Sequence, residues 1–264
     1  MIGIFKSWRR KRTLQHKALD DGLWQHVTRS LPFLQGLAPG ERQRLRNCAV
    51  LFLDEKQMHG ARGFVLTDAV RLSIAVQACL PILNLGLDFY EGWVGIVIYP
   101  GEFKVQREHM DASGVVHEYD DELSGEAWPG GPVILSWQDV TLGEGGYNVV
   151  IHEFAHKLHM RHGDMDDFPA PRADMDREQW LSAWDAAYDE FCAEVDRGTD
   201  TLIDPYASEQ PAEFFAVLSE TFFTLPRAVR SIYPELYAQL ARFYKQDPAA
   251  RLPQYDSARA SKKL

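Results

Sequence analysis

The chain has 264 residues, and 45% of them are hydrophobic, which is enough for a substantial core in one large domain or two small ones. Asp and Glu outnumber Lys and Arg by 38 to 28, so the net charge is -10 at pH 7, and this balance disfavours nucleic acid as the main partner because phosphate binding needs a cationic face. The three cysteines (Cys48, Cys79 and Cys192) are odd in number and widely spaced, which argues against a disulfide framework and indicates a reducing cytoplasm.

The N-terminal residues 1–18 (MIGIFKSWRRKRTLQHKA) are basic and lack the continuous apolar stretch of a signal peptide. Their RRKR cluster at 9–12 could contact an anionic surface, but we interpret the whole segment as a solvated, flexible tail. Because the sequence contains no internal repeat or long linker, we expect a single domain over residues 19–250 and a second tail over residues 251–264.

Hydrophobic periodicity predicts helices on the N-terminal side and a group of strands before the centre of the chain. The most apolar run, residues 72–89, is interrupted by polar residues and a proline, so it predicts a buried helix followed by a turn and neither a membrane span nor a membrane partner. The predicted elements are helices at about 21–55 and 67–82 and strands near 94–99, 103–107, 115–119 and 132–136. With the helices that follow, they indicate an α+β fold whose site lies between the sheet edge and two helices.

The last of these strands, PVILS, is rich in β-forming residues and follows two glycines. It reads as an edge strand to which an extended peptide substrate could add through backbone hydrogen bonds, with Val133, Ile134 and Leu135 as the candidate substrate-binding residues. An ordinary core strand would give the same pattern.

Residues 149–160 read VVIHEFAHKLHM and carry a possible metal site. His152 and His156 are four residues apart, so on a helix both imidazoles lie on one face and can reach a single ion. A catalytic zinc ion held by two imidazoles also needs a third protein ligand, an open position for water and a carboxylate that accepts a proton from that water. Glu153 supplies the carboxylate, and the apolar residues around the motif place it on a buried helix.

The third ligand is open at this point. A metzincin arrangement would use His162, but it requires a glycine at the position of His159 to let the chain leave the helix sharply, and we therefore rank it second. The other downstream candidates are His159, Asp164, Asp166, Glu213 and Glu220.

Two further helices are expected beyond the motif. Residues 176–198 place aromatic side chains at helical spacing, so one side packs and the acidic side is solvated. In residues 204–226, Pro211 suits a first helical turn, with Ser208 as a possible cap. Glu213 and Glu220 are seven apart and share a face of that helix, so spacing alone does not choose between them as the third ligand.

Three segments of the chain resemble the Mlc titration factor A family: GVVHEYDDELSGEAWPGGPVILSW, GYNVVIHEFAHKLHMRHGD and DPYASEQPAEFFAVLSETFF. The similarity extends over almost the whole chain apart from its two ends. It implies a zincin-like metallopeptidase fold with a small mixed sheet, an HExxH helix and additional helices at both ends. It also implies one Zn²⁺ per chain in a gluzincin-type site related to the lethal-factor protease, aminopeptidase activity on small peptides, and binding to a glucose-responsive repressor of the Mlc type.

The resemblance also assigns individual residues. It implies that His152, His156 and Glu213 bind zinc, that Glu153 is the general base, and that Tyr206 lies near the open coordination position, where its phenol could stabilise the oxyanion. The family pattern usually has an acidic residue three positions after the second zinc histidine, where this chain has a histidine. That departure would alter the groups that orient the metal ligands.

His117 resembles a histidine that the family places on the metal as a further ligand. Residues 118–125 are polar and turn-rich, consistent with a movable loop, so we expect that His117 could occupy the open zinc position in a resting form until substrate or a partner displaces it.

Two functional classes follow from these observations. In the first, the protein is a zinc aminopeptidase; in the second, it mainly binds and titrates a repressor and its zinc site is latent. A purely structural zinc site is less consistent with two histidines and a glutamate than with a cysteine-rich set, although such a site could hold other divalent metals.

Overall fold

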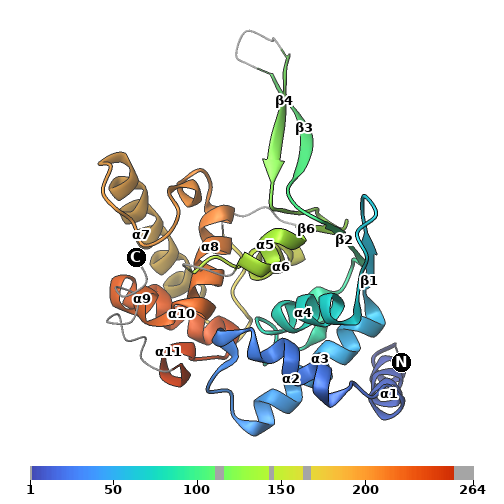
Figure 1. The fold of residues 1–264 in the computed structure, drawn as a ribbon. Helices are drawn as coiled ribbons and strands as arrows, with labels where there is room; N and C mark the ends of the chain where they lie inside the picture. The colour runs from blue at the N-terminus through green and yellow to red at the C-terminus, as the bar shows by residue number, and fades with distance from the viewer. Residues whose placement is uncertain (1, 111–115, 143–145, 163–167, 253–264) are drawn as a thin grey trace, which may run out of the picture.

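The computed structural model describes residues 2–110, 116–142, 146–162 and 168–252. Within these ranges the chain forms an α+β fold (Figure 1), as predicted. The strands are β1 (Gln57–Gly60), β2 (Gly95–Tyr99), β3 (Phe103–Met110), β4 (Val116–Leu123), β5 (Gly125–Ala127) and β6 (Val133–Ser136). The α-helices are α1 (Ile2–His16), α2 (Asp21–Arg29), α3 (Pro39–Glu55), α4 (Asp68–Cys79), α5 (Trp137–Leu142), α6 (Val149–His159), α7 (Arg177–Asp196), α8 (Pro211–Thr224), α9 (Pro226–Ile232), α10 (Pro234–Tyr244) and α11 (Pro248–Arg251). Short 3-10 helices are η1 (Pro32–Leu34), η2 (Leu87–Tyr90), η3 (Met160–His162) and η4 (Pro205–Ser208).

The main sheet has the strand order β1-β2-β6-β5, with the first three strands parallel and β5 antiparallel to β6. The prediction that residues 133–135 form an edge strand is therefore wrong, because β6 is paired on both sides. The edge strands are β1 and β5, and the one beside β6 is β5, a strand of only three residues whose sequence, GEA, has little β propensity. A tight turn at Trp128–Gly131 returns the chain from β5 to β6.

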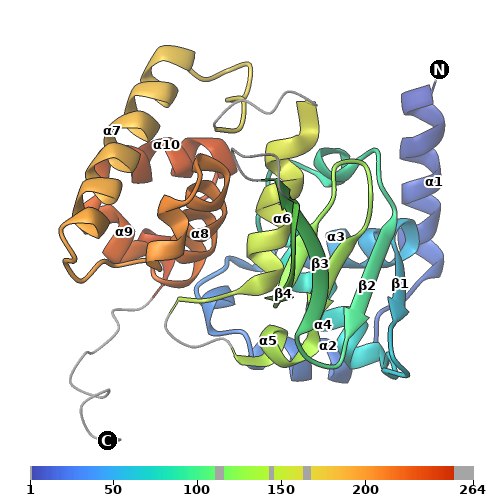
Figure 2. The same cartoon turned by 90° about the horizontal axis from the view of Figure 1, so that it is seen from above.

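The core lies where this sheet meets the helices. Val133 and Leu135 are fully buried, whereas the intervening Ile134 faces the other side of the sheet, as strand alternation requires. Phe154 of α6 packs against Tyr90 and Trp93, with ring centroids 5.1 and 5.6 Å apart. In Figures 1 and 2, α6 runs between the sheet with its N-terminal helices on one side and the group α7 to α10 on the other. Helix α6 is thus placed to bring its side chains together with those of the sheet on one side and of the group α7 to α10 on the other.

Strands β3 and β4 form a separate antiparallel hairpin that projects from the body (Figure 1). Residues 118–125, expected to be a loop, instead lie mostly in β4 and β5, where each strand residue has a backbone partner on a neighbouring strand. His117 lies within β4, in register with His109 of β3. The side chains of residues 104–122 lie outside the described part of the structure.

The N-terminal segment is helical and docked, which corrects the prediction of a flexible tail. Residues of α1 form ion pairs with carboxylates of α3 and η2, among them Arg10 with Glu55 at 2.8 Å and Lys6 with Asp88 at 2.8 Å. The predicted tail at 251–264 falls mostly on residues 253–264, which lie outside the described residues. Among the helices described, none is long and apolar enough to cross a membrane.

Candidate metal centre

Helix α6 begins because Asn148 caps it, its side-chain oxygen accepting from the Ile151 amide at 2.9 Å. Gly146, with φ +100°, allows the turn before the cap. Almost every residue of α6 is buried, so its polar side chains must find partners inside the protein. The helix runs through His159 into η3, which is the outcome expected when the metzincin glycine is missing.

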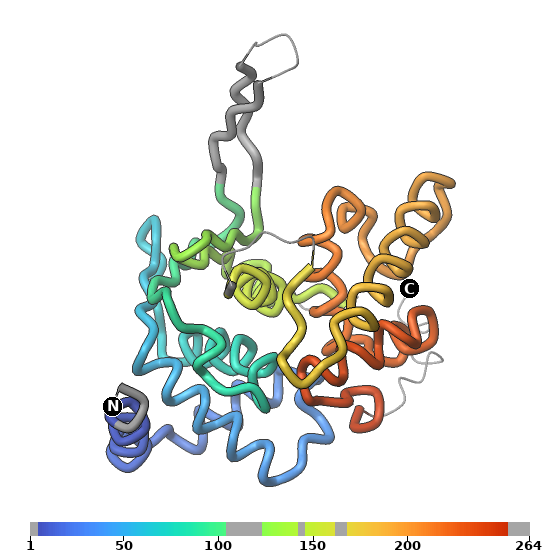
Figure 3. The backbone as a smooth tube through the Cα atoms, turned by 180° about the vertical axis from the view of Figure 1, so that it is seen from behind, coloured from blue at the N-terminus to red at the C-terminus, as the bar shows by residue number. Residues whose placement is uncertain are grey.

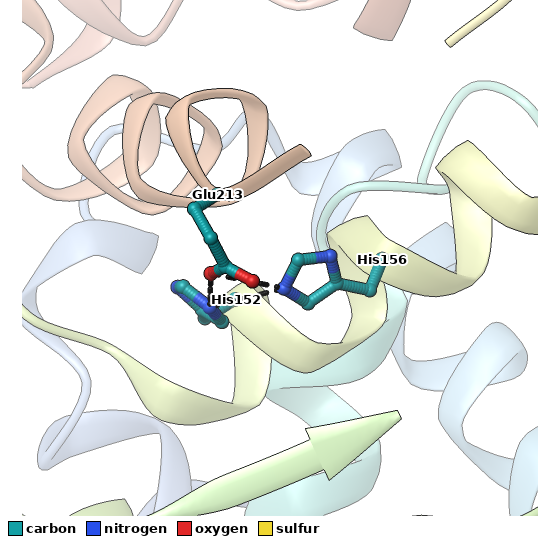
Figure 4. Close-up of side chains that lie close together, drawn as sticks. All are labelled: His152, His156 and Glu213. Atoms are coloured by element: carbon teal, nitrogen blue, oxygen red, sulfur yellow. Dashed lines mark hydrogen bonds and ion pairs between the residues drawn. The ribbon is translucent and has the colours of Figure 1, made fainter. Parts of the chain in front are cut away.

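Three of the predicted site residues converge at one point (Figure 4). The Nε2 atoms of His152 and His156 lie 3.2 Å apart, and each approaches Oε2 of Glu213, at 3.2 and 3.4 Å. One ligand atom from each residue lies within 4.8 Å of the others. Glu213 reaches this point from the first turn of α8, where Pro211 starts the helix.

Glu220 lies on the other side of His152. Its Oε1 is 3.4 Å from Nδ1 of His152, and its Oε2 accepts from the Asn148 backbone amide at 2.6 Å. A carboxylate at Nδ1 holds a histidine in the tautomer whose Nε2 lone pair is free to bind a metal. The geometry therefore separates the two glutamates, with Glu213 beside both imidazoles and Glu220 behind one of them.

This donor set fits a divalent metal ion. Two imidazoles and one carboxylate are the ligands of known His-His-Glu zinc sites, which keep a position open for water. A carboxylate behind one histidine is the usual support for such a site. His152, His156 and Glu213 could therefore hold the ion, with Glu220 orienting the first of them.

Burial and charge set the protonation of these groups. Burial raises the pKa of Glu153 to about 8, an effect that His152 opposes and that Glu213 and Glu126 strengthen. Burial also acts to raise the pKa of Glu213, but hydrogen bonds from the two imidazoles outweigh it and hold that pKa well below its usual range. Burial acts to lower the pKa of His152, but hydrogen bonds to two glutamates raise it well above its ordinary value. Burial lowers the pKa of His156. At neutral pH these shifts leave Glu213 ionised and keep protons on Glu153 and His152, and a cation at the centre of the cluster would favour the release of both protons.

Comparison with known proteins identifies the family. The model of the glucose-regulated metallo-peptidase M90 family matches residues 5–245. The chain belongs to this family. It is also 36% identical over 239 residues to Mlc titration factor A of Yersinia pestis (strain Pestoides F) and to that of Yersinia pseudotuberculosis serotype O:3 (strain YPIII). Each alignment covers 89% of this chain and 88% of the relative.

In this M90 family member, the edge strand β5 runs directly over Glu153. A Cβ added at Gly125 would lie 2.3 Å from Oε1 of Glu153, so only glycine allows this approach. Two backbone hydrogen bonds flank β5 and join it to the chain of β6: the Ser136 amide donates to the Ser124 carbonyl at 2.8 Å, and the Trp128 amide donates to the Pro132 carbonyl at 3.1 Å. Because bonded positions alternate along an antiparallel pair, Gly125 and Ala127 turn their N–H and C=O groups toward the open edge.

Lys157, next to the second histidine, holds the turn that carries β5. Its Nζ donates to the carbonyls of Trp128 and Gly131 at 2.5 and 2.8 Å and lies 4.8 Å from the centre of the Trp93 ring. Lys56 lies over the same ring, at 3.6 Å. Sequence analysis missed Lys157 and Gly125, although the adjacency of Lys157 to the HExxH motif was a signal that could have drawn attention to it.

The positions of the other predicted residues are as follows. Tyr206 lies on η4, beside α8, and is 46% exposed. His159 is buried near Phe215, with ring centroids 6.2 Å apart. The side chains of His117 and His162 lie outside the described residues, as do Asp164 and Asp166.

Proposed function

We propose that this M90 family member is a zinc-dependent aminopeptidase that acts on small peptides. One observation carries the proposal: the two histidines of the His152, His156 and Glu213 cluster lie on the same buried helix as Glu153, a carboxylate that a structural metal site does not need. The family supports metallopeptidase chemistry, while the preference for a free N-terminus and the identity of the metal as zinc are proposals that rest on the resemblance described above.

His152, His156 and Glu213 would hold the ion, which when bound supplies polarisation of the scissile carbonyl and acidification of a water molecule. Glu153 accepts the proton of the attacking water and returns it to the leaving amine. Its Oε2 is buried and has no hydrogen-bond partner among the described residues, so it is available for that transfer. Burial raises the pKa of Glu153 to about 8, so its ionised form is a stronger base than an exposed glutamate, and a cation held by the cluster would favour that ionised form.

The substrate would bind as an extended strand along β5. Gly125 and Ala127 offer outward N–H and C=O groups for pairing with a peptide backbone, next to the carboxylate of Glu153. Tyr206 is the proposed donor to the developing oxyanion. A Tyr206→Phe variant that retained full turnover would remove it from that role.

His117 remains a proposed resting-state ligand. If substrate displaces it, His117→Ala should be more active than wild type at low substrate concentration, with the metal content unchanged. Equal activity in the two proteins would count against the idea.

The second candidate function is binding to a repressor of the Mlc type, and it is favoured by the name of the relatives, Mlc titration factor A. Both functions fit one protein, which would then act in the cytoplasm. Capture of the purified repressor by wild type and by Glu153→Gln to the same extent would show that binding is independent of catalysis.

The peptidase proposal is tested by comparing wild type with Glu153→Gln on a panel of aminoacyl chromogenic substrates, with metal content measured in both. We expect hydrolysis only by wild type, at equal metal content. N-acetylated versions of the same substrates are the control, and their hydrolysis would indicate endopeptidase action instead. Absence of hydrolysis by metal-loaded wild type would favour the repressor-binding function.

A further inference from the structure

Among the residues of α1 whose side chains the structure describes, ion pairs and hydrogen bonds join the helix to the body. Lys6, Arg10, Thr13 and Lys17 follow one another at intervals of four, three and four residues and so share one face. Each donates to a carboxylate of α3 or η2, at 2.6 to 3.1 Å in the pairs Lys6–Asp88, Arg10–Glu55, Thr13–Asp54 and Lys17–Asp54. The polar face of this helix is therefore the one that faces the protein.

The outer face carries large apolar side chains instead. Phe5 is 69% exposed and Trp8 is 56% exposed, which makes them the most exposed aromatic residues among those described. Their ring centroids are 6.2 Å apart, and the guanidinium of Arg12 lies 5.7 Å from the Trp8 ring. Figures 2 and 3 place α1 at the periphery of the molecule, remote from α7 to α10. Nothing in the described part of the protein covers these two rings.

The charge of α1 is opposite to that of the rest of the chain. The helix contains no acidic residue, whereas the whole chain carries a net charge of -10. The inward cations are compensated by the body, but Lys11 and Arg12 are exposed. An aromatic pair and two exposed cations, which have no ion pair with the described residues, thus lie together on an outward surface.

We propose that the outer face of α1, formed by Phe5, Trp8, Lys11 and Arg12, binds the surface of an anionic lipid bilayer. Such an interface offers phosphate groups for the cations and an apolar layer just below them for the rings. An acidic protein or a nucleic acid would match the cations, but each would also have to provide a site for two neighbouring rings. The contact is peripheral, goes beyond the proposed peptidase function, and revises the expectation that no membrane is involved.

The test is co-sedimentation of the full chain with large unilamellar vesicles. One set is phosphatidylcholine alone, and the other contains about one-quarter phosphatidylglycerol. We expect wild type to bind only the anionic vesicles and to be released at about 0.5 M salt, where charges are screened within a few ångströms. Lys11→Gln/Arg12→Gln should bind about thirtyfold less tightly. Phe5→Ser/Trp8→Ser should bind at least about tenfold less tightly.

Controls separate this interpretation from its alternatives. Val65→Ser removes another apolar side chain, 75% exposed and outside α1, and should bind like wild type. All four proteins should have the same helix content and the same aminoacyl hydrolysis. The proposal is overturned if wild type does not sediment with either vesicle, if it binds neutral vesicles equally well, or if the α1 variants bind like wild type. Release from anionic vesicles by a DNA oligonucleotide at equal phosphate concentration would overturn it in favour of nucleic acid.

Discussion

Glu220→Gln is the perturbation that most sharply separates the residues that hold the metal from those that orient them. Glu220 is 3% exposed and makes two contacts, with Nδ1 of His152 at 3.4 Å and with the Asn148 amide at 2.6 Å. Glutamine keeps the size of the side chain and an oxygen for Asn148. Its amide group, however, removes the negative charge that holds the His152 proton on Nδ1.

The expected loss of metal affinity follows from those contacts. Loss of a carboxylate that supports a metal-binding histidine lowers metal affinity by about 10- to 100-fold, equivalent to about 1.4 to 2.7 kcal/mol. Glu213→Gln, which alters a ligand itself, should lower metal affinity further. Glu220→Ala would also leave the buried Asn148 amide without its acceptor, at about 1 to 3 kcal/mol of unfolding free energy.

The assay is competition for zinc between each purified protein and a chromogenic chelator, supported by thermal unfolding of the metal-free forms. The predicted order of affinity is wild type, Glu220→Gln, Glu213→Gln. Metal affinity in Glu220→Gln equal to that of wild type, or lower than that of Glu213→Gln, would refute the assigned geometry.

Further predictions concern the substrate edge, its support, the metal and helix α1. Gly125→Ala should lower kcat/KM about tenfold or more without loss of metal, because the new Cβ would fall 2.3 Å from Glu153 Oε1 and must displace β5 or the base. Lys157→Met removes two hydrogen bonds to the β5–β6 turn, so it should raise KM for peptides and lower the unfolding free energy, measured by denaturant titration, by about 2 kcal/mol. The control variant Lys56→Met should leave KM unchanged. Removing the metal with a chelator should lower Tm, and zinc at about 1,000 times its Kd should restore about 4 kcal/mol of stability. Hydrogen bonds from Lys17 and Lys6 lower the pKa of Asp54 and Asp88, which anchor α1. Their contribution to stability is therefore present above about pH 4, the ordinary pKa of an aspartate, and is lost as pH falls through the lowered values, so hydrogen exchange in α1, corrected for its intrinsic rate, should lose protection as pH falls below about 4.

The sequence predicted the site as far as local spacing allows. His152 and His156 share a face because four residues make about one helical turn, and that holds wherever the helix lies. The choice between Glu213 and Glu220 could not be made in the same way, because it depends on how α8 rests against α6. Because the two glutamates are seven residues apart, a shift of α8 by about two turns along its axis would bring Glu220 to the place of Glu213.

Errors in the fold prediction have similar causes. Strand β5 is too short and too poor in β-forming residues to be detected, so its neighbour β6 was taken for the edge. Helix α1 is basic and has few apolar contacts, which is typical of a solvated segment. Its partners Asp54, Glu55 and Asp88 lie dozens of residues away, and no local pattern connects them to it.

The most direct test of the central claim is a crystal structure of the zinc-loaded protein with anomalous data collected at the zinc edge. The account predicts one strong peak at about 2.0 to 2.2 Å from Nε2 of His152, Nε2 of His156 and a carboxylate oxygen of Glu213, with Glu220 on Nδ1 of His152. A peak bound by Glu220 in place of Glu213, or no peak at this point in protein that contains stoichiometric zinc, would contradict it.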